Sequence, residues 1–155
     1  MEQKTKVNAE DGKQELTITR EFDLPVELVF RAYTEAGLLE QWMGTKVLKL
    51  DSKKHGSYEL ETTDPSGKVL FKGSGVIHDY EPNKKITRTF EIANAPLGVQ
   101  LEVYNFESLT DDTSKLNVHV VYESVAQRDQ VIKFGMAPGI NMAHNRLQEV
   151  VGKLK

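Results

Sequence analysis

The chain contains no cysteine among its 155 residues. Disulfide bonds, thiolate metal ligands and cysteine nucleophiles are therefore excluded, and a small secreted scaffold built on disulfides is excluded with them. An excess of one charge is also missing, because 20 Lys and Arg residues stand against 23 Asp and Glu residues and leave a formal net charge of −3. A chain without a basic excess does not attract the nucleic-acid backbone, so we expect no nucleic-acid partner.

Long apolar runs are missing as well. No stretch approaches the roughly 18 apolar residues that cross a bilayer, and the first 14 residues lack the apolar core of a signal peptide. We therefore expect a cytoplasmic protein with no membrane insertion. A chain of this length is expected to form one domain, which we place at residues 15–155, after a flexible N-terminal segment at residues 1–14 in which a strand could begin as early as Lys6.

Two short helices are predicted to follow a first strand. Residues 15–22 alternate apolar residues with threonine, as in a strand. Pro25 suits the first position of a helix, and Gly37 is expected to end it. Residues 38–43 then form a second helix that is too short to be stable alone and needs tertiary contacts. The buried face of the first helix is predicted from residues spaced three to four apart: Val26, Val29, Phe30 and Tyr33.

From residue 46 onward the pattern is that of strands separated by turns. The predicted strands cover residues 46–51, 57–63, 69–80, 85–92, 99–109 and 115–123, spaced as in an antiparallel meander. Gly73 and Gly75 lie inside the longest strand and favour a bulge or a sharp bend there. Together with Ser74 they also resemble part of a nucleotide-binding loop, but this fragment opens no helix, so the bend is favoured.

The chain closes with its longest helical pattern. A short helical segment is predicted at residues 124–134, Gly135 interrupts it, and Pro138 occupies the first turn of a helix that runs to about residue 154. The apolar stripe of this helix comprises Ile140, Ala143, Leu147, Val150, Val151 and Leu154. We expect the stripe to face the concave side of a curved sheet.

Reactive groups show no recognisable arrangement. The four histidines are dispersed without the spacing of metal ligands, so no metal site is predicted, and we assign no catalytic residue and no cofactor. Arg88 shares one strand face with apolar neighbours. It either pairs with a carboxylate such as Asp79 or Glu102, which we favour because buried arginines are usually paired, or it anchors an acidic ligand.

Aromatic and methionine side chains are the candidates for the wall of a pocket. Trp42 and Met43 either line a pocket entrance or anchor the helix pair in the core, and the sequence favours neither alternative. Met136 and Met142, near the start of the last helix, could form a pliable wall, although methionine more often fills gaps in a core.

These segments resemble a known family. The series ITREFDLPVELVFRAYTE at residues 18–35, LLEQW at 38–42, GSY at 56–58, GVIHDYEP at 75–82, LNV at 116–118 and the final helix are similar to the activator of heat-shock-protein-90 ATPase homologue family, in the START-like (SRPBCC) superfamily. The resemblance implies an α+β helix-grip fold. In that fold a curved antiparallel sheet of about six or seven strands wraps around a long C-terminal helix, and two short helices follow the first strand.

The resemblance also implies a hydrophobic cavity between the sheet and the last helix. The leading hypothesis is non-catalytic binding of a small apolar or amphipathic ligand. One alternative is a cyclase-like or hydrolase-like enzyme that uses Arg88, Asp79 or His119 in the same cavity. Another is an interaction module with a role in the stress response, whose partner is a chaperone or another protein, and in each case we expect a monomer or a weak homodimer. The expected lining comprises Trp42, Met43, Tyr58, Leu60, Phe71, Ile77, Arg88, Phe90, Tyr104, His119, Phe134, Met136, Ile140 and Met142.

Overall fold

The computed structural model describes residues 4–93, 95 and 97–155. The strands are β1 (Lys6–Asn8), β2 (Glu15–Phe22), β3 (Lys46–Leu50), β4 (Ser57–Thr63), β5 (Val69–Glu81), β6 (Lys85–Ile92), β7 (Val99–Ser108) and β8 (Ser114–Val121). The helices are α1 (Val26–Thr34), α2 (Ala36–Met43), α3 (Val125–Lys133) and α4 (Met136–Gly152).

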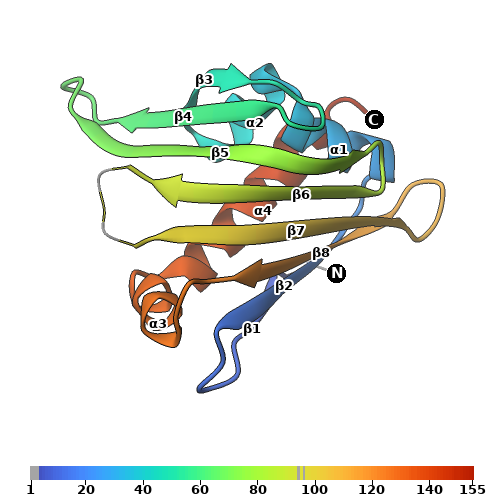
Figure 1. The fold of residues 1–155 in the computed structure, drawn as a ribbon. Helices are drawn as coiled ribbons and strands as arrows, with labels where there is room; N and C mark the ends of the chain where they lie inside the picture. The colour runs from blue at the N-terminus through green and yellow to red at the C-terminus, as the bar shows by residue number, and fades with distance from the viewer. Residues whose placement is uncertain (1–3, 94, 96) are drawn as a thin grey trace.

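All these strands form one antiparallel sheet in the order β1-β2-β8-β7-β6-β5-β4-β3 (Figure 1). The long helix α4 crosses behind one face of the sheet, and α1 and α2 pack beside it. This arrangement confirms the predicted helix-grip fold. Within the described residues, no helix is both long and apolar enough to cross a bilayer.

The sheet has eight strands where six or seven were expected. The additional strand is β1, whose Val7 pairs with Ile18 of β2. It lies in the segment that we expected to be a flexible extension. A strand of three residues is too short to show an alternating pattern, so only its pairing with β2 reveals it.

Local sequence signals set most of the helix ends. The hydroxyl of Ser124 accepts a hydrogen bond from the backbone N–H of Gln127 and caps α3, and Gly135 separates α3 from α4 with a φ of 82°. The prediction for Gly37 was wrong, because the chain leaves the helical conformation at Glu35 and Gly37 lies inside α2. Burial of Leu39 and Trp42 orients α2, so tertiary packing outweighs the local glycine signal.

The core is closed at one end of α4 and open at the other. Alternate residues of β8, such as Leu116 and Val118, are buried on the concave side of the sheet. The C-terminal half of α4 contributes Leu147 and Val151, both fully buried. In its N-terminal half, by contrast, Ile140 is only half-buried. The sheet and the helix therefore pack tightly only along part of their shared length.

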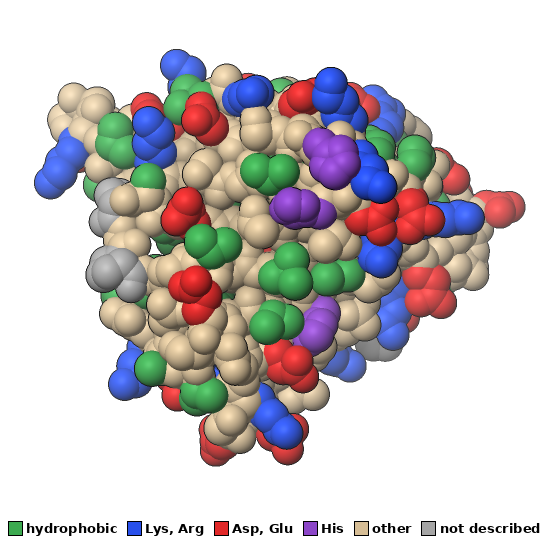
Figure 2. All heavy atoms as spheres, in the orientation of Figure 1, with side chains coloured by type: hydrophobic (Ala, Val, Ile, Leu, Met, Phe, Trp, Pro, Cys, Tyr) green, Lys and Arg blue, Asp and Glu red, His purple; other side chains and the backbone are tan. Residues whose placement is uncertain are grey.

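The convex face of the sheet has no helix over it in Figure 1. In the same orientation, Figure 2 shows small groups of hydrophobic side chains interspersed with histidine and charged residues. Leu101 on β7 and Val76 on β5 are exposed hydrophobic residues of this sheet. The alternation along the strands thus separates a concave face that carries the core from a convex face of mixed composition.

Gly75 lets a tyrosine of β4 reach across β5 to β6. The Tyr58 hydroxyl donates a hydrogen bond of 2.6 Å to the backbone oxygen of Thr89, and a Cβ atom at Gly75 would lie 1.9 Å from that oxygen. The register shift between β5 and β6 lies between Ile77 and Asp79 of β5, away from the glycines. Gly75 therefore provides space for a close contact between strands, and the bulge expected near it lies further along the strand.

We expect Gly75→Ala to lower the free energy of unfolding by about 2–4 kcal/mol, because the added methyl group displaces the Thr89 backbone and breaks the Tyr58 hydrogen bond. The matched control is Gly37→Ala on α2, where a Cβ atom meets nothing within 4 Å. It should be neutral or stabilising by up to about 1 kcal/mol. Urea denaturation of both variants measures the difference, and equal stabilities would contradict this account.

Candidate functional site

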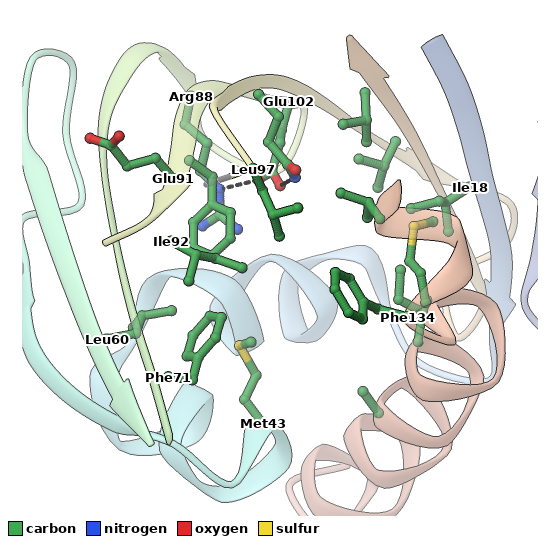
Figure 3. A pocket seen from close by; sticks show the side chains of 18 of the residues that line it. Ile18, Met43, Leu60, Phe71, Arg88, Glu91, Ile92, Leu97, Glu102 and Phe134 are labelled. Atoms are coloured by element: carbon green, nitrogen blue, oxygen red, sulfur yellow. Dashed lines mark hydrogen bonds and ion pairs between the residues drawn. The ribbon is translucent and has the colours of Figure 1, made fainter. Parts of the chain in front are cut away.

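A cavity of about 540 Å³ lies between the concave face of the sheet and the N-terminal half of α4 (Figure 3). Apolar side chains make up most of its wall, including Leu60 from β4 and Val118 from β8. Figure 3 shows Met43 and Phe71 on one side of the opening and Phe134 on the other. The cavity thus occupies the region where α4 does not pack closely against the sheet.

Most of the residues predicted to line a cavity do so. They come from α2, from strands β4 to β7, and from the α3–α4 corner and α4, which are far apart in the sequence and meet only in the folded chain. The predicted residues found in the lining are Trp42, Met43, Leu60, Phe71, Arg88, Phe90, Tyr104, Phe134, Met136 and Ile140.

Two predicted lining residues are buried elsewhere. Tyr58 lies behind Arg88, whose guanidinium carbon is 4.7 Å from the centre of the tyrosine ring. Ile77 is buried in the core on the later half of β5. That half of the strand ends near α1, where Tyr80 packs against Phe30 with 5.5 Å between the ring centres. Both residues belong to the concave side, but tightly packed parts of the core separate them from the cavity.

The other two predicted lining residues lie outside the core. His119 alternates with the buried Val118 and Val120 and therefore lies on the convex face, where its Nε2 atom is 3.0 Å from the Glu15 carboxylate. Met142 is 71% exposed, because it lies about 200° around the helix from the lining residue Ile140. Strand alternation and helical phase explain both misplacements.

Trp42 and Met43 turn out to have different positions. Trp42 is buried in the cavity wall, and its indole Nε1–H donates a hydrogen bond of 2.8 Å to the backbone oxygen of Ala32. Met43 is 40% exposed, and Phe134 on the opposite side is 72% exposed. The tryptophan is therefore a core anchor that forms part of the cavity wall, away from the entrance, while Met43 and Phe134 lie at the opening.

A buried polar cluster interrupts the apolar wall. Arg88 donates from Nε to Glu102 Oε1 at 2.8 Å and from Nη2 to the Tyr104 hydroxyl at 2.8 Å. The same Glu102 carboxylate accepts a hydrogen bond of 2.6 Å from Gln100 and one of 3.0 Å from the Tyr104 hydroxyl. The expected pairing of Arg88 with Glu102 is therefore confirmed. The alternative partner, Asp79, instead pairs with Lys85 at 3.5 Å.

The guanidinium of Arg88 is fixed between two aromatic rings. Its central carbon lies 4.7 Å from the ring centre of Tyr58 and 4.8 Å from that of Tyr104. Burial acts to lower the pKa of Arg88, but the neighbouring acidic groups of Tyr104, Tyr58 and Glu102 outweigh it and raise the pKa well above its usual value. The side chain thus remains a charged hydrogen-bond donor at the cavity wall.

A second polar group lies where α4 meets α1 and β1. The His144 ring is buried, with Nδ1 2.6 Å from the Thr5 hydroxyl and Nε2 3.4 Å from the Tyr33 hydroxyl. Burial, together with the nearby charge of Arg20, lowers the pKa of His144 to about 3. The imidazole is therefore neutral at physiological pH and can act as both donor and acceptor.

Several of these polar residues were missing from the predicted lining, although the periodicity of β7 and α4 places them on the faces that line the cavity. Gln100 and Glu102 alternate on β7 with the predicted lining residue Tyr104, so the three share one face, and all three line the cavity. His144 follows the lining residue Ile140 by one helical turn and lines the cavity too. Strand and helix periodicity places Gln100, Glu102 and His144 on the same faces as the predicted lining residues Tyr104 and Ile140.

The three residues considered for catalysis do not meet. Arg88 lines the cavity, whereas His119 and Asp79 do not: His119 is hydrogen-bonded to Glu15, and Asp79 forms an ion pair with Lys85. Among the described residues, no three His, Asp or Glu side chains gather in a way that could hold a metal ion. The arrangement favours the binding of an apolar molecule beside a fixed set of hydrogen-bonding groups.

The curved sheet, the enclosed long helix and the cavity between them define a START-like (SRPBCC) protein. The sequence pattern of the family described as "Activator of Hsp90 ATPase homolog 1-like protein" matches residues 23–152, and the chain belongs to this family. Comparison with functionally curated proteins gives no match.

Several solved structures share the fold. A protein from Arthrobacter aurescens superposes with a TM-score of 0.85 at 20% identity, covering 96% of this chain and 91% of that one. The protein Ms6760 from Mycobacterium smegmatis gives a TM-score of 0.83 at 24% identity, with coverage of 94% and 95%. A protein from Rhodobacter sphaeroides gives 0.82 at 20% identity, with coverage of 97% and 100%. At these identities the likeness establishes the shared fold alone.

The lowered pKa of His144 predicts that acid destabilises the fold through this residue. Above pH 6.5 the ring is neutral in both the folded and the unfolded chain, so its contribution to stability is fully present. Between pH 6.5 and about 3 only the unfolded chain binds a proton, and the free energy of unfolding falls by about 1.4 kcal/mol per pH unit.

His144→Gln should remove this part of the pH dependence. We expect the wild type to lose roughly 3 kcal/mol more than the variant between pH 6.5 and pH 4, as measured by urea denaturation at several pH values. His78→Gln, at an exposed histidine of β5, is the control and should follow the wild type. Parallel pH curves for the wild type and His144→Gln would contradict the assignment.

Proposed function

We propose that the protein binds a small, mainly apolar molecule in the cavity between the sheet and α4, without chemical conversion. The observation that carries this proposal is the cavity itself, since about 540 Å³ falls within the range of roughly 300–1,000 Å³ typical of small-molecule sites. Its apolar wall favours an apolar body, and its few fixed polar groups favour one orientation of that body.

The exposure of residues at the opening supports access from solvent. Phe134 follows α3 and Met43 ends α2, and both are exposed while lining the cavity. The neighbouring Gly135 lies between α3 and α4 in the left-handed region of backbone conformation. In this proposal these side chains surround the entrance through which the ligand passes.

A partner protein is the second candidate, and the family membership of the chain favours it. The family description refers to an activator of the Hsp90 ATPase, so a chaperone is the partner to examine. Such a partner would bind the outer surface, which includes exposed hydrophobic residues such as Leu101 and Val76. Surface binding should not depend on the volume of the cavity, and this difference separates the two candidates.

Ala143→Trp should abolish ligand binding by filling the cavity, because Ala143 lines it from α4. Ligands are found by solvent extraction with mass spectrometry and by a thermal-shift screen of lipids and aromatic compounds. A ligand at 100 times its Kd should raise the Tm of the wild type by about 5–10 °C. Met142→Trp places the same side chain on the exposed neighbour and should retain the full shift.

Melting curves without ligand establish that both variants are folded. Loss of the shift in Ala143→Trp alone would support the cavity as the binding site. Equal shifts in the two variants would place the ligand elsewhere. A wild-type protein that yields no extracted molecule and no stabilising compound would contradict the proposal and favour a protein partner.

A further inference from the structure

We infer that the ligand carries an uncharged hydrogen-bond-accepting oxygen, of the carbonyl type, on its apolar body. This inference rests on the proposed function and specifies the class of molecule that the cavity selects. It follows from which hydrogen-bond donors and acceptors of the polar lining residues are already paired, and from which donors have no acceptor among the described residues.

Arg88 has a donor for which the described residues offer no acceptor. Its Nε and Nη2 atoms donate to Glu102 and Tyr104, and within the described residues no partner is found for Nη1. The guanidinium lines the cavity, and Figure 3 shows it beside Glu102 at the inner wall. Two hydrogen bonds and the rings of Tyr58 and Tyr104, whose centres lie 4.7 and 4.8 Å from its central carbon, restrain the guanidinium and so fix the direction of its Nη1 edge.

Glu102 is the acidic partner of this arginine, and donors already surround it. Arg88, Tyr104 and Gln100 together donate three hydrogen bonds to its two oxygen atoms. The carboxylate of Glu91, the other acidic lining residue, is exposed, and Figure 3 shows it pointing away from the interior. The two carboxylates of the lining are therefore occupied or remote, whereas a ligand that offers an acceptor meets the charged donor of Arg88.

The buried histidine provides a second donor through Tyr33. Arg20 Nη1 donates to the Thr5 hydroxyl oxygen, and the Thr5 O–H, which needs an acceptor of its own, has His144 Nδ1 at 2.6 Å. In the tautomer that accepts this hydrogen bond, the imidazole proton is on Nε2 and is donated to the Tyr33 hydroxyl oxygen. The Tyr33 O–H, with no acceptor among the described residues, then remains to be donated to a ligand in the cavity that Tyr33 lines.

The balance of charge selects a neutral acceptor over an anion. Arg88 is the one Lys or Arg residue among the described residues that line the cavity, and the Glu102 carboxylate neutralises it. His144 is neutral, so a buried carboxylate or phosphate would find no uncompensated positive charge among the described lining residues. A ketone, an aldehyde or an ester presents acceptor lone pairs without the cost of burying a net charge.

Three matched naphthalene probes test this inference. The first is 2-acetylnaphthalene, the second is 2-isopropenylnaphthalene, which has the same shape without the acceptor, and the third is 2-naphthoate, which is anionic. We expect the wild type to bind the ketone about ten-fold more tightly than the alkene in calorimetric titration, because the hydrogen bonds from Arg88 and Tyr33, at about three-fold each, together contribute about that factor. Naphthoate should bind more weakly than the ketone.

The variants assign this preference to its donors. Arg88→Met combined with Glu102→Gln removes the ion pair without leaving a lone buried charge and should lower the ketone-to-alkene ratio to about 3 or below. Tyr33→Phe leaves the ion pair in place and should lower the ketone-to-alkene ratio about three-fold. If the double variant does not fold, this single variant still tests the inference. The carbonyl stretch of the bound ketone should move to higher frequency in each variant as a hydrogen bond is lost.

Each result decides a separate point. If the wild type binds the ketone and the alkene equally, the ligand needs no hydrogen-bond acceptor, and the inference is overturned while the cavity proposal stays intact. If naphthoate binds more tightly than the ketone, the inference that the ligand is uncharged is overturned. If the wild type and Ala143→Trp bind all three probes equally well, the probes bind outside the cavity, and this result would instead overturn the proposed function. Imidazole ¹⁵N NMR should find His144 protonated at Nε2, and protonation at Nδ1 would remove Tyr33 as a donor.

Discussion

The unequal packing of α4 against the sheet is the constraint on which the rest of the structure depends. Leu147 and Val151 in the C-terminal half of the helix are fully buried and close one end of the core. One or two turns earlier, Ala143 and Ile140 face a cavity of about 540 Å³. Because a closed core would have required larger side chains at these positions, the helix both stabilises the fold and leaves room for a ligand.

The ion pair of Arg88 and Glu102 is better explained by binding than by stability. Burial of two charges costs several kcal/mol per ion, and packed apolar residues of similar volume often replace such pairs without loss. Here the pair lies at the wall of an apolar cavity, with Tyr58 and Tyr104 enclosing the arginine. A fixed and charge-balanced donor in such a place gives orientation to a ligand, which an apolar replacement would not.

Sequence patterns predicted the architecture well, because strand alternation and helix periodicity act over many residues. They left a strand from Lys6 only as an alternative to a flexible segment, because β1 is too short to show a pattern. They also misplaced the first helix break, since burial of Leu39 and Trp42 outweighs the glycine at position 37. Apolar lining residues such as Leu60 and Phe90 were predicted from their strand faces. The hydrogen bonds of His144 with Thr5 and Tyr33 join residues more than 100 positions apart, and only the folded chain reveals them.

The central claim is that the cavity between the sheet and α4 binds an apolar molecule. Its most direct test is a methyl-labelled NMR measurement of intermolecular nuclear Overhauser effects with bound 2-acetylnaphthalene. The account predicts contacts with the inward methyl groups of Leu60, Val118 and Ile140 and none with Leu101 on the convex face. Contacts with Leu101 alone, or with no methyl group of the cavity wall, would contradict it.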